Sequence, residues 1–307
     1  MSQSFLVDAA DEFLRVLRGL SDPTPEEILA SWDRFYRQGF PDLHGKQTRD
    51  YTAAGEDWRE IALTRVFPPL PERLELMEEA RTRLARLGGD VTARARAALA
   101  LGLDVVAVVH MGVGCGAGWA TTYGGRPAVL FGLENIAELG WHTEERLAGL
   151  IAHELGHLIH RLWRGEPLEE LEEDPYGLLY VEGFAQRLEH RILGRESWHL
   201  APDAGWLFSC SAHLAEIARA YRDRVIRGEA VNVFFGSWLS FQGIPFTGHF
   251  LGHTVVRALG ERRSLPELAR LPLADVRASV DRFFRTLEAP DSSEDAAGRP
   301  SSLEGLP

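Results

Sequence analysis

The residues with the clearest chemical potential are two histidines and a glutamate, in the segment His153-Glu154-Leu155-Gly156-His157. Residues four apart on a helix lie on one face, so His153 and His157 can offer two imidazole nitrogens to one zinc ion. Glu154 lies beside them and can act on a water molecule that the metal activates. The same pattern also arises by chance in helices that bind no metal, so its context decides between the two.

The run from Thr143 to Trp163 has the features of one amphipathic helix. Thr143 can cap its N-terminus, and acidic residues occupy the first turn. Apolar residues recur at helical spacing and form one stripe, made of Leu147, Ile151, Leu155, Leu158 and Leu162. The two histidines lie off this stripe, so we expect them to face a different surface.

A third metal ligand is expected, because a catalytic zinc ion usually takes three protein ligands and leaves one position open. His160 lies on the same helix as His153, but about 10 Å further along its axis, too far for both to bind one ion. A metzincin-type extension would need glycine at position 160 and histidine at position 163. The sequence has His160 and Trp163 at these positions, which excludes a metzincin-type zinc site.

The next predicted helix, Tyr176 to Leu193, offers three candidates for the third ligand, namely Glu182, Glu189 and His190. We favour Glu182, because the small residues Gly183 and Ala185 beside it leave room for a second helix to approach closely. The alternative is that Glu182 is an ordinary exposed glutamate. Among the other histidines, His110 is expected in the core, His142 and His199 in turns beside tryptophans, and His213 at a helix start from which it can face the site.

Residues 1–100 are expected to form a helical region without a catalytic signature. The predicted helices run from Ser4 to Leu20, from the start SDPTPEEIL to about Gln38, from Glu56 to Val66 and from Glu72 to Leu87. The glycines in Gly88-Gly89-Asp90 are expected to end the last of these.

The pattern changes after residue 100. Asp104 to His110 is a continuous β-branched run typical of a buried strand, and Thr121 to Tyr123 with Pro127 to Phe131 indicates a hairpin around Gly124-Gly125. Further helices are predicted at Ser211 to Arg227 and His249 to Leu259, an aromatic and Gly-rich loop with a short strand between them, and short helices opening at Leu265 and Leu273. The fold class is therefore α+β, mostly helical, with a small sheet before the histidine helix. Residues 289–307 are expected to be a disordered tail.

The segment Gly112 to Ala117 offers a rival interpretation, since it follows a strand and fits the dinucleotide fingerprint G-x-G-x-x-G/A. That site needs a helix N-terminus directly after the glycines to hold the pyrophosphate. Trp119 to Val129 instead has the pattern of strand, turn and strand. We therefore expect the glycines to form a flexible rim near the metal site.

Composition and charge limit the classes of partner. A length of 307 residues suits one large domain or two smaller ones, and a net charge of −12 with scattered basic residues argues against nucleic acid. Two cysteines, Cys115 and Cys210, make no disulfide framework and indicate a reducing compartment. The N-terminus lacks the basic start of a signal peptide, and no apolar run approaches the ~18 residues of a membrane span. A cytoplasmic protein without membrane partners is expected.

His153, Glu154, His157 and Glu182 together resemble the gluzincin metallopeptidases, in which a helix after the HExxH helix supplies a glutamate. A narrower resemblance is to a bacterial family of predicted zinc-dependent proteases, first catalogued as a domain of unknown function. Its motifs are matched by His153 to His157, by Glu182-Gly-Phe-Ala185 and by Gly248-His-Phe-Leu-Gly252-His253. The resemblance covers roughly residues 100–260. It implies a zincin-like domain over residues 101–288 behind the helical region 1–100.

The resemblance implies a metallopeptidase with one zinc ion per chain and a peptide or protein as substrate. Glu154 would be the general base, and the hairpin could offer an edge to an extended peptide. A side chain outside the HExxH helix would stabilise the oxyanion, for which His249 is our first candidate and His253, one turn along, the second. Both stand where the family tends to carry tyrosine; the alternative is that they are surface or packing residues.

Two other functions remain open, a non-catalytic zincin fold used for binding or scaffolding, and a zinc hydrolase that acts on something other than peptides. The two histidines and Glu154 together favour an enzyme, because a decayed site would be expected to lose one of them. The sequence leaves the oligomeric state, the substrate sequence and the choice between exopeptidase and endopeptidase open.

Overall fold

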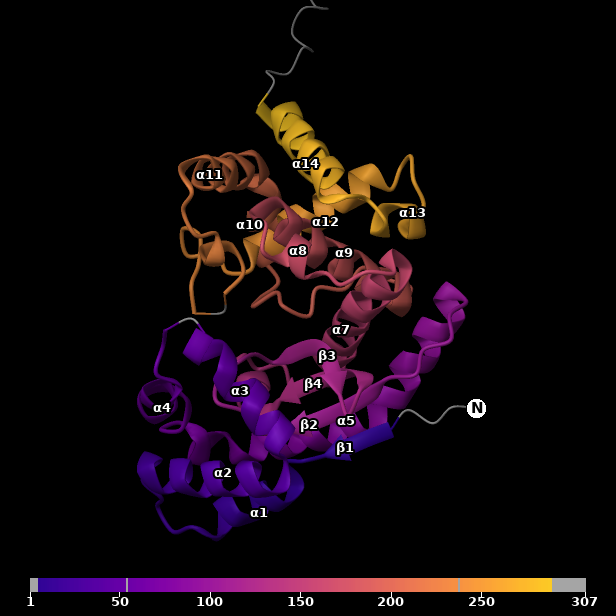
Figure 1. The fold of residues 1–307 in the computed structure, drawn as a ribbon. Helices are drawn as coiled ribbons and strands as arrows, with labels where there is room; N and C mark the ends of the chain where they lie inside the picture. Colours follow the sequence, from indigo (N-terminus) through magenta and orange to yellow (C-terminus); the bar gives the residue numbers. More distant parts are fainter. Residues whose placement is uncertain (1–4, 54, 237, 289–307) are drawn as a thin grey trace, which may run out of the picture.

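The protein contains a small mixed sheet and many helices. The helix that carries His153 and His157 is α7 (Glu144–Arg164). The computed structural model describes residues 5–53, 55–236 and 238–288. Figure 1 shows the sheet and the N-terminal helices in the lower half, the C-terminal helices in the upper half, and α7 between them. The mostly helical α+β class expected from the sequence is confirmed.

The sheet has four strands in the order β1-β2-β4-β3: β1 (Phe5–Asp8), β2 (Val106–His110), β4 (Arg126–Gly132) and β3 (Gly118–Tyr123). β2 pairs in parallel with β1 and β4, and β3 pairs antiparallel with β4. The predicted buried strand and the predicted hairpin are therefore confirmed. β3 lies at one edge of the sheet, with its outer side free of any strand in the described part of the chain.

The helix predicted from Ser4 to Leu20 is wrong in its first part, where the chain forms β1 before α1 (Asp11–Gly19). Residues 5–8 pair with β2, about a hundred positions later in the sequence, which overrides their helical periodicity. Asp8 separates the two elements, because its Oδ1 accepts hydrogen bonds from the backbone N–H groups of Ala10 at 3.2 Å and Asp11 at 3.1 Å. These N–H groups have no partner inside α1, so their bonds to Asp8 stabilise a helix that begins after β1.

The predicted stop at Gly88-Gly89-Asp90 is also wrong, since α5 runs unbroken from Leu70 to Leu99. Each glycine costs about 1 kcal/mol in a helix interior. Leu84, Leu87 and Val91 around them are buried, and burial of one such side chain contributes about 1.5–3 kcal/mol. Packing of the long helix therefore outweighs the local preference of its glycines.

The other N-terminal elements follow the sequence more closely. The second predicted helix is α2 (Pro25–Gly39), which begins with a capping box between Thr24 and Glu27. The helix expected from Glu56 to Val66 divides into α4 (Trp58–Ile61) and a π-helical turn η1 (Ala62–Val66). A further helix, α3 (Pro41–Ala53), was not predicted, because its apolar residues show little helical periodicity.

The C-terminal half is helical. Its elements are α6 (Leu133–Glu138), α8 (Glu169–Glu172), α9 (Pro175–Leu193), α10 (Trp206–Ala212), α11 (Leu214–Arg227), η2 (Asn232–Phe234), α12 (Thr247–Leu259), α13 (Leu265–Ala269) and α14 (Leu273–Glu288). The helix expected from Ser211 to Arg227 is thus two helices that meet at His213. Between η2 and α12 the expected short strand is a single bridge, Phe241 to Ile244. The expected tail, 289–307, lies outside the described residues.

The two predicted regions meet extensively. β1 belongs to the same sheet as β2, and α5 packs against α6, α7 and α9. The N-terminal region is therefore not purely helical, and the division at residue 100 stays a prediction. Within the described ranges, no helix combines the length and the apolar character that a membrane span needs.

Candidate metal centre

The two motif histidines project from the middle of α7 toward the same point. Thr143 caps the helix through its side chain and Gly165 ends it in the left-handed conformation, so the predicted bounds are confirmed. The Nε2 atoms of His153 and His157 lie 3.2 Å apart. His153 is 3% exposed, which places this end of the pair out of contact with bulk water.

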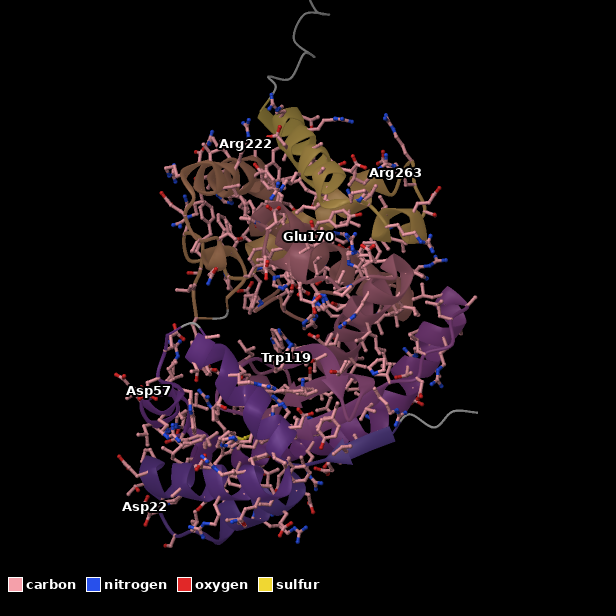
Figure 2. All side chains as sticks on the ribbon, in the orientation of Figure 1. Asp22, Asp57, Trp119, Glu170, Arg222 and Arg263 are labelled. Atoms are coloured by element: carbon pink, nitrogen blue, oxygen red, sulfur yellow. The ribbon has the colours of Figure 1, made fainter. Side chains whose placement is uncertain are left out.

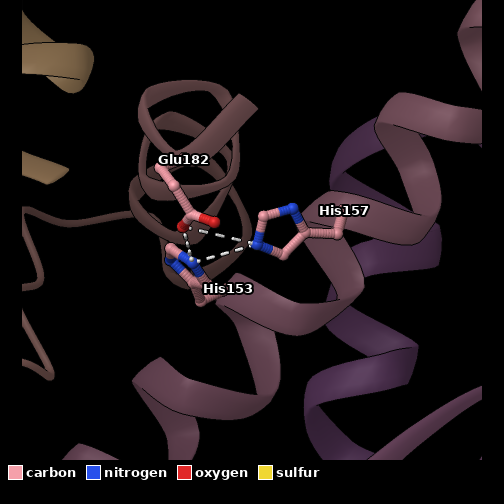
Figure 3. Close-up of side chains that lie close together, drawn as sticks. All are labelled: His153, His157 and Glu182. Atoms are coloured by element: carbon pink, nitrogen blue, oxygen red, sulfur yellow. Dashed lines mark hydrogen bonds and ion pairs between the residues drawn. The ribbon is translucent and has the colours of Figure 1, made fainter. Parts of the chain in front are cut away.

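Glu182 approaches the histidines from α9, as Figure 3 shows. Its Oε2 lies 3.3 Å from Nε2 of His153 and 3.6 Å from Nε2 of His157. The three residues form a group whose ligand atoms all lie within 4.8 Å of one another. The structure therefore brings together the three ligands that the sequence predicted.

The separations in this triangle fit one small cation. Two donors at about 2.1 Å from a tetrahedral ion stand about 3.4 Å apart, and the three observed separations are 3.2, 3.3 and 3.6 Å. Two imidazole nitrogens and a carboxylate oxygen are a donor set that zinc prefers, and the fourth corner is left to water or substrate. The donor set and its spacing therefore suit a metal ion.

Small residues allow the two helices to bring these ligands together. A Cβ on Gly156 of α7 would lie 3.0 Å from both the Cα and the carbonyl oxygen of Ala185 on α9. Gly183 serves a different contact, because a Cβ there would lie 2.0 Å from the carbonyl carbon of Gly252 on α12. Ala185 thus sets the distance from α9 to α7, while Gly183 and Gly252 set the distance to α12.

The charges of the cluster favour a cation. Burial alone would raise the pKa of Glu182, but the facing His157, His153 and His249 outweigh burial and hold it well below its ordinary value. Burial lowers the pKa of His157 to about 4. Burial acts the same way on His153, but the nearby carboxylates of Glu182 and Glu189 reverse it and raise the pKa to about 10. A positive charge is therefore stabilised at His153, whether a proton or a metal ion carries it.

Glu154 lies on the sheet side of the histidines, against β3. A Cβ on Gly118 would come within 2.5 Å of Oε1 of Glu154, so only glycine leaves this space. Burial raises the pKa of Glu154 to about 7, although the charge of His153 and a hydrogen bond from the Ala120 backbone act in the opposite direction. A carboxylate with a pKa near neutrality is suited to accept and return a proton.

His249 and His253, the two predicted oxyanion donors, lie in different surroundings. His249 comes from the first turn of α12, and its Nε2 lies 3.2 Å from Oε2 of Glu182. This histidine therefore joins the cluster. His253 does not: it is buried between His190, at 4.5 Å between ring centroids, and Trp198, at 4.9 Å. One further turn of α12 places it beyond the cluster of His153, His157 and Glu182, so the structure separates His253 from the candidate centre.

Two residues lie behind His153: Glu189, a candidate third ligand that was not favoured, and His199, which was expected only in a turn. Oε2 of Glu189 lies 3.7 Å from Nδ1 of His153 and 2.8 Å from Nδ1 of His199, and both acceptor and histidines are buried. Glu189, His153 and His199 form a second group whose ligand atoms lie within 4.8 Å of one another. A carboxylate on the far nitrogen of a metal-binding histidine fixes its tautomer and orientation.

A sequence signal for Glu189 existed, because it stands two turns after Glu182 on the same face of α9. His199 had no such signal, since it reaches the site only where the chain folds back after α9. The turn expected for His199 is confirmed, but its side chain is buried against Trp141, 4.8 Å away between ring centroids. His213 is exposed and does not line the cavity that opens in front of His153, so the interpretation that it can face the site is wrong.

A cavity of about 1030 Å³ opens in front of these residues, which we call the metal cavity. Its lining includes His153, Glu154, His157, Glu182, His199 and His249. Edge-strand residues from Gly118 to Thr121 form one wall, and the loop after η2 contributes aromatic side chains to the other. His160 does not line this cavity and stacks on Phe184, with 4.1 Å between the ring centroids. This agrees with the prediction that His160 is not a ligand.

The glycine loop between β2 and β3 lies at the rim of the metal cavity, as expected, but hydrogen bonds to Glu134 and Asn135 hold its backbone. The carboxylate of Glu134 accepts hydrogen bonds from the backbone N–H groups of Gly112 at 2.7 Å and Gly114 at 3.2 Å. The side-chain oxygen of Asn135 accepts from Gly116 at 3.1 Å. β3 follows the glycines directly, and it gives no helix N-terminus for a pyrophosphate. The loop instead forms a fixed wall of the metal cavity.

Comparisons with protein-family models, with curated proteins and with solved structures find no match to this chain.

Proposed function

We propose that the chain is a zinc-dependent metallopeptidase of the gluzincin type, with His153, His157 and Glu182 as the metal ligands. The observation that supports this most strongly is the triangle of donor atoms, whose sides of 3.2, 3.3 and 3.6 Å suit one tetrahedral ion. The resemblance in HExxH and in the segment Glu182 to Ala185 points to the same class. A buried carboxylate beside the ligands, Glu154, completes the set of groups that hydrolysis needs.

The proposed reaction is hydrolysis of an amide bond. A bound zinc ion acidifies water and polarises a carbonyl group. Glu154 takes the proton from the attacking water and returns it to the leaving amine, with the Ala120 N–H holding its carboxylate against β3. The carboxylate of Glu189 lies 3.7 Å from Nδ1 of His153, and its charge favours a proton on that nitrogen, which leaves Nε2 for the metal.

A peptide substrate is supported by the position of β3. This strand is at the edge of the sheet, and its residues Gly118 to Thr121 line the metal cavity. An extended peptide can pair with such an edge through its backbone. Figure 2 labels Trp119 in the space between the lower sheet and the upper helices, where its ring can contact a substrate side chain.

His249 is the proposed donor to the oxyanion. It lines the metal cavity and its Nε2 lies 3.2 Å from a ligand oxygen. Removing one such donor typically costs about 10²–10³ in turnover. We expect His249→Ala to lower turnover by this factor while zinc content and melting temperature stay near wild type. Turnover within a few-fold of wild type would remove His249 from the reaction; His253→Ala, one turn away in another environment, is the matched control.

Cleavage of a mixed peptide library by the zinc-loaded chain tests the proposed function. We expect peptides to be cleaved, and a zinc chelator to abolish the products until zinc is restored. Zinc-loaded protein that cleaves no peptide would contradict the peptidase and favour a zinc-dependent binding protein. Mass spectrometry of the products also shows whether cleavage is at chain ends or inside the peptide.

A further inference from the structure

A second cavity, of about 840 Å³, lies on other faces of α9 and α12 and shares no lining residue with the metal cavity. Its lining contains five arginines and one carboxylate, Glu196. We call it the arginine pocket; its arginines are Arg187, Arg191, Arg195, Arg257 and Arg263. Such a concentration of positive charge is unexpected in a chain with a net charge of −12.

Most of these arginines have no carboxylate to neutralise them. Of these five arginines, only Arg195 makes an ion pair within residues 5–53, 55–236 and 238–288, with Glu145 at 3.0 Å. The one lining carboxylate, Glu196, accepts a hydrogen bond from Trp198 Nε1 at 3.0 Å. Burial lowers the pKa of Arg187, and the charges of Arg257 and Arg191 lower it further. The guanidinium groups thus repel one another, and an anion between them would relieve that repulsion.

The arginines come from different elements, so the protein brings them together only by folding. Arg187 and Arg191 are one turn apart on α9, and Arg257 comes from α12 beside it. Arg263 comes from the loop before α13, where Figure 2 labels it. Guanidinium groups bind phosphate and carboxylate oxygens through paired N–H groups, which a single lysine cannot reproduce.

A buried polar group without a partner also lines the pocket. His253 is 4% exposed, and its Nε2 has no hydrogen-bond partner in the described structure. Such buried groups are usually satisfied by a protein atom, a water molecule or a ligand. Apolar side chains form part of the remaining wall, among them Trp163 and Leu265. The pocket therefore combines unpaired cations, an unsatisfied imidazole and an apolar surface.

We propose that the arginine pocket binds a small phosphate-bearing anion, such as a phosphorylated metabolite or a free polyphosphate. Phosphate groups place two or more charges in a small volume, which suits four guanidinium groups that α9, α12 and the loop before α13 bring together without a carboxylate partner among the described residues. The proposal does not depend on the peptidase, because it uses none of the metal-cavity residues. The volume of about 840 Å³ accommodates an organic portion beside the phosphates.

Calorimetric titration of the full chain with inorganic pyrophosphate tests the proposal. We expect wild type to bind with a dissociation constant below about 1 mM, and Arg187→Gln with Arg257→Gln to weaken binding at least tenfold. Arg219→Gln, an exposed arginine on α11 outside both cavities, is the matched control and should bind as wild type does. If the double variant does not fold, Arg191→Gln at an exposed position takes its place and should weaken binding several-fold.

Four outcomes would overturn the inference. The first is the absence of pyrophosphate binding by wild type up to about 10 mM. The second is equal loss in the Arg219→Gln control, which would show unspecific attraction. The third is binding that survives the double substitution but is lost in His157→Ala, which would place the anion on the metal centre. Tighter binding of citrate than of pyrophosphate would replace the phosphate ligand by a polycarboxylate and likewise overturn it.

Discussion

Replacing Glu154 with glutamine is expected to reduce peptide hydrolysis by a factor of about 10³ while zinc content stays at the wild-type level. Glutamine keeps the size of the side chain and an oxygen that can accept the hydrogen bond from the Ala120 backbone. It cannot accept a proton from water, so it removes the proposed base without opening the space against Gly118. Turnover is measured on a peptide from the library together with metal analysis of the same sample.

Zinc content distinguishes a general base from a metal ligand, because only the loss of a ligand should lower it. Loss of activity and of zinc together would show that Glu154 supports the metal site and is not a base. Retention of near-normal turnover by Glu154→Gln would exclude it from catalysis. His160→Gln is a suitable control on the same helix, because His160 is stacked on Phe184 and away from the metal cavity.

Gly183→Ala is expected to lower the free energy of unfolding by about 3 kcal/mol, the upper range for overpacking in a filled interior. The added methyl group would lie 2.0 Å from the Gly252 carbonyl carbon, so α9 and α12 must separate. Backbone atoms cannot rotate away as the end of a side chain could. Because Glu182 is the preceding residue on α9, the displacement should also weaken zinc binding. Urea unfolding and zinc titration measure the two effects.

Gly89→Ala is the matched control for this substitution. Gly89 is an exposed residue of α5, and no atom lies within 4 Å of the position of an added Cβ. Alanine there should raise the free energy of unfolding by about 1 kcal/mol, the usual gain in a helix interior. Equal stability of Gly183→Ala and wild type would contradict the close helix contact.

The part of the site that was predictable from the sequence depends on local geometry. His153 and His157 stand one helical turn apart, and Thr143 and Gly165 fix the ends of their helix, so neither inference required knowledge of the fold. Glu182 required one further step, the expectation that small residues permit close packing. That expectation holds through Ala185 against Gly156, whereas Gly183 contacts a helix that the argument had not considered.

The parts that were missed depend on distant contacts. β1 is a strand because β2 is available to pair with it, and no local pattern reports that partner. His199 reaches the metal site through the return of the chain after α9 and its bond to Glu189. His253 shows the opposite error, since one turn of about 6 Å along α12 places it beside His190 and away from the candidate ligands.

The central claim is that one zinc ion is held by His153, His157 and Glu182, and metal analysis of the purified protein tests it most directly. The account predicts one zinc per chain in wild type and in the control His213→Ala, whose histidine is exposed and outside the metal cavity. It predicts a large loss of zinc in His157→Ala and in Glu182→Ala, because each removes one of three ligands. Full zinc occupancy in both of these variants would contradict the assignment.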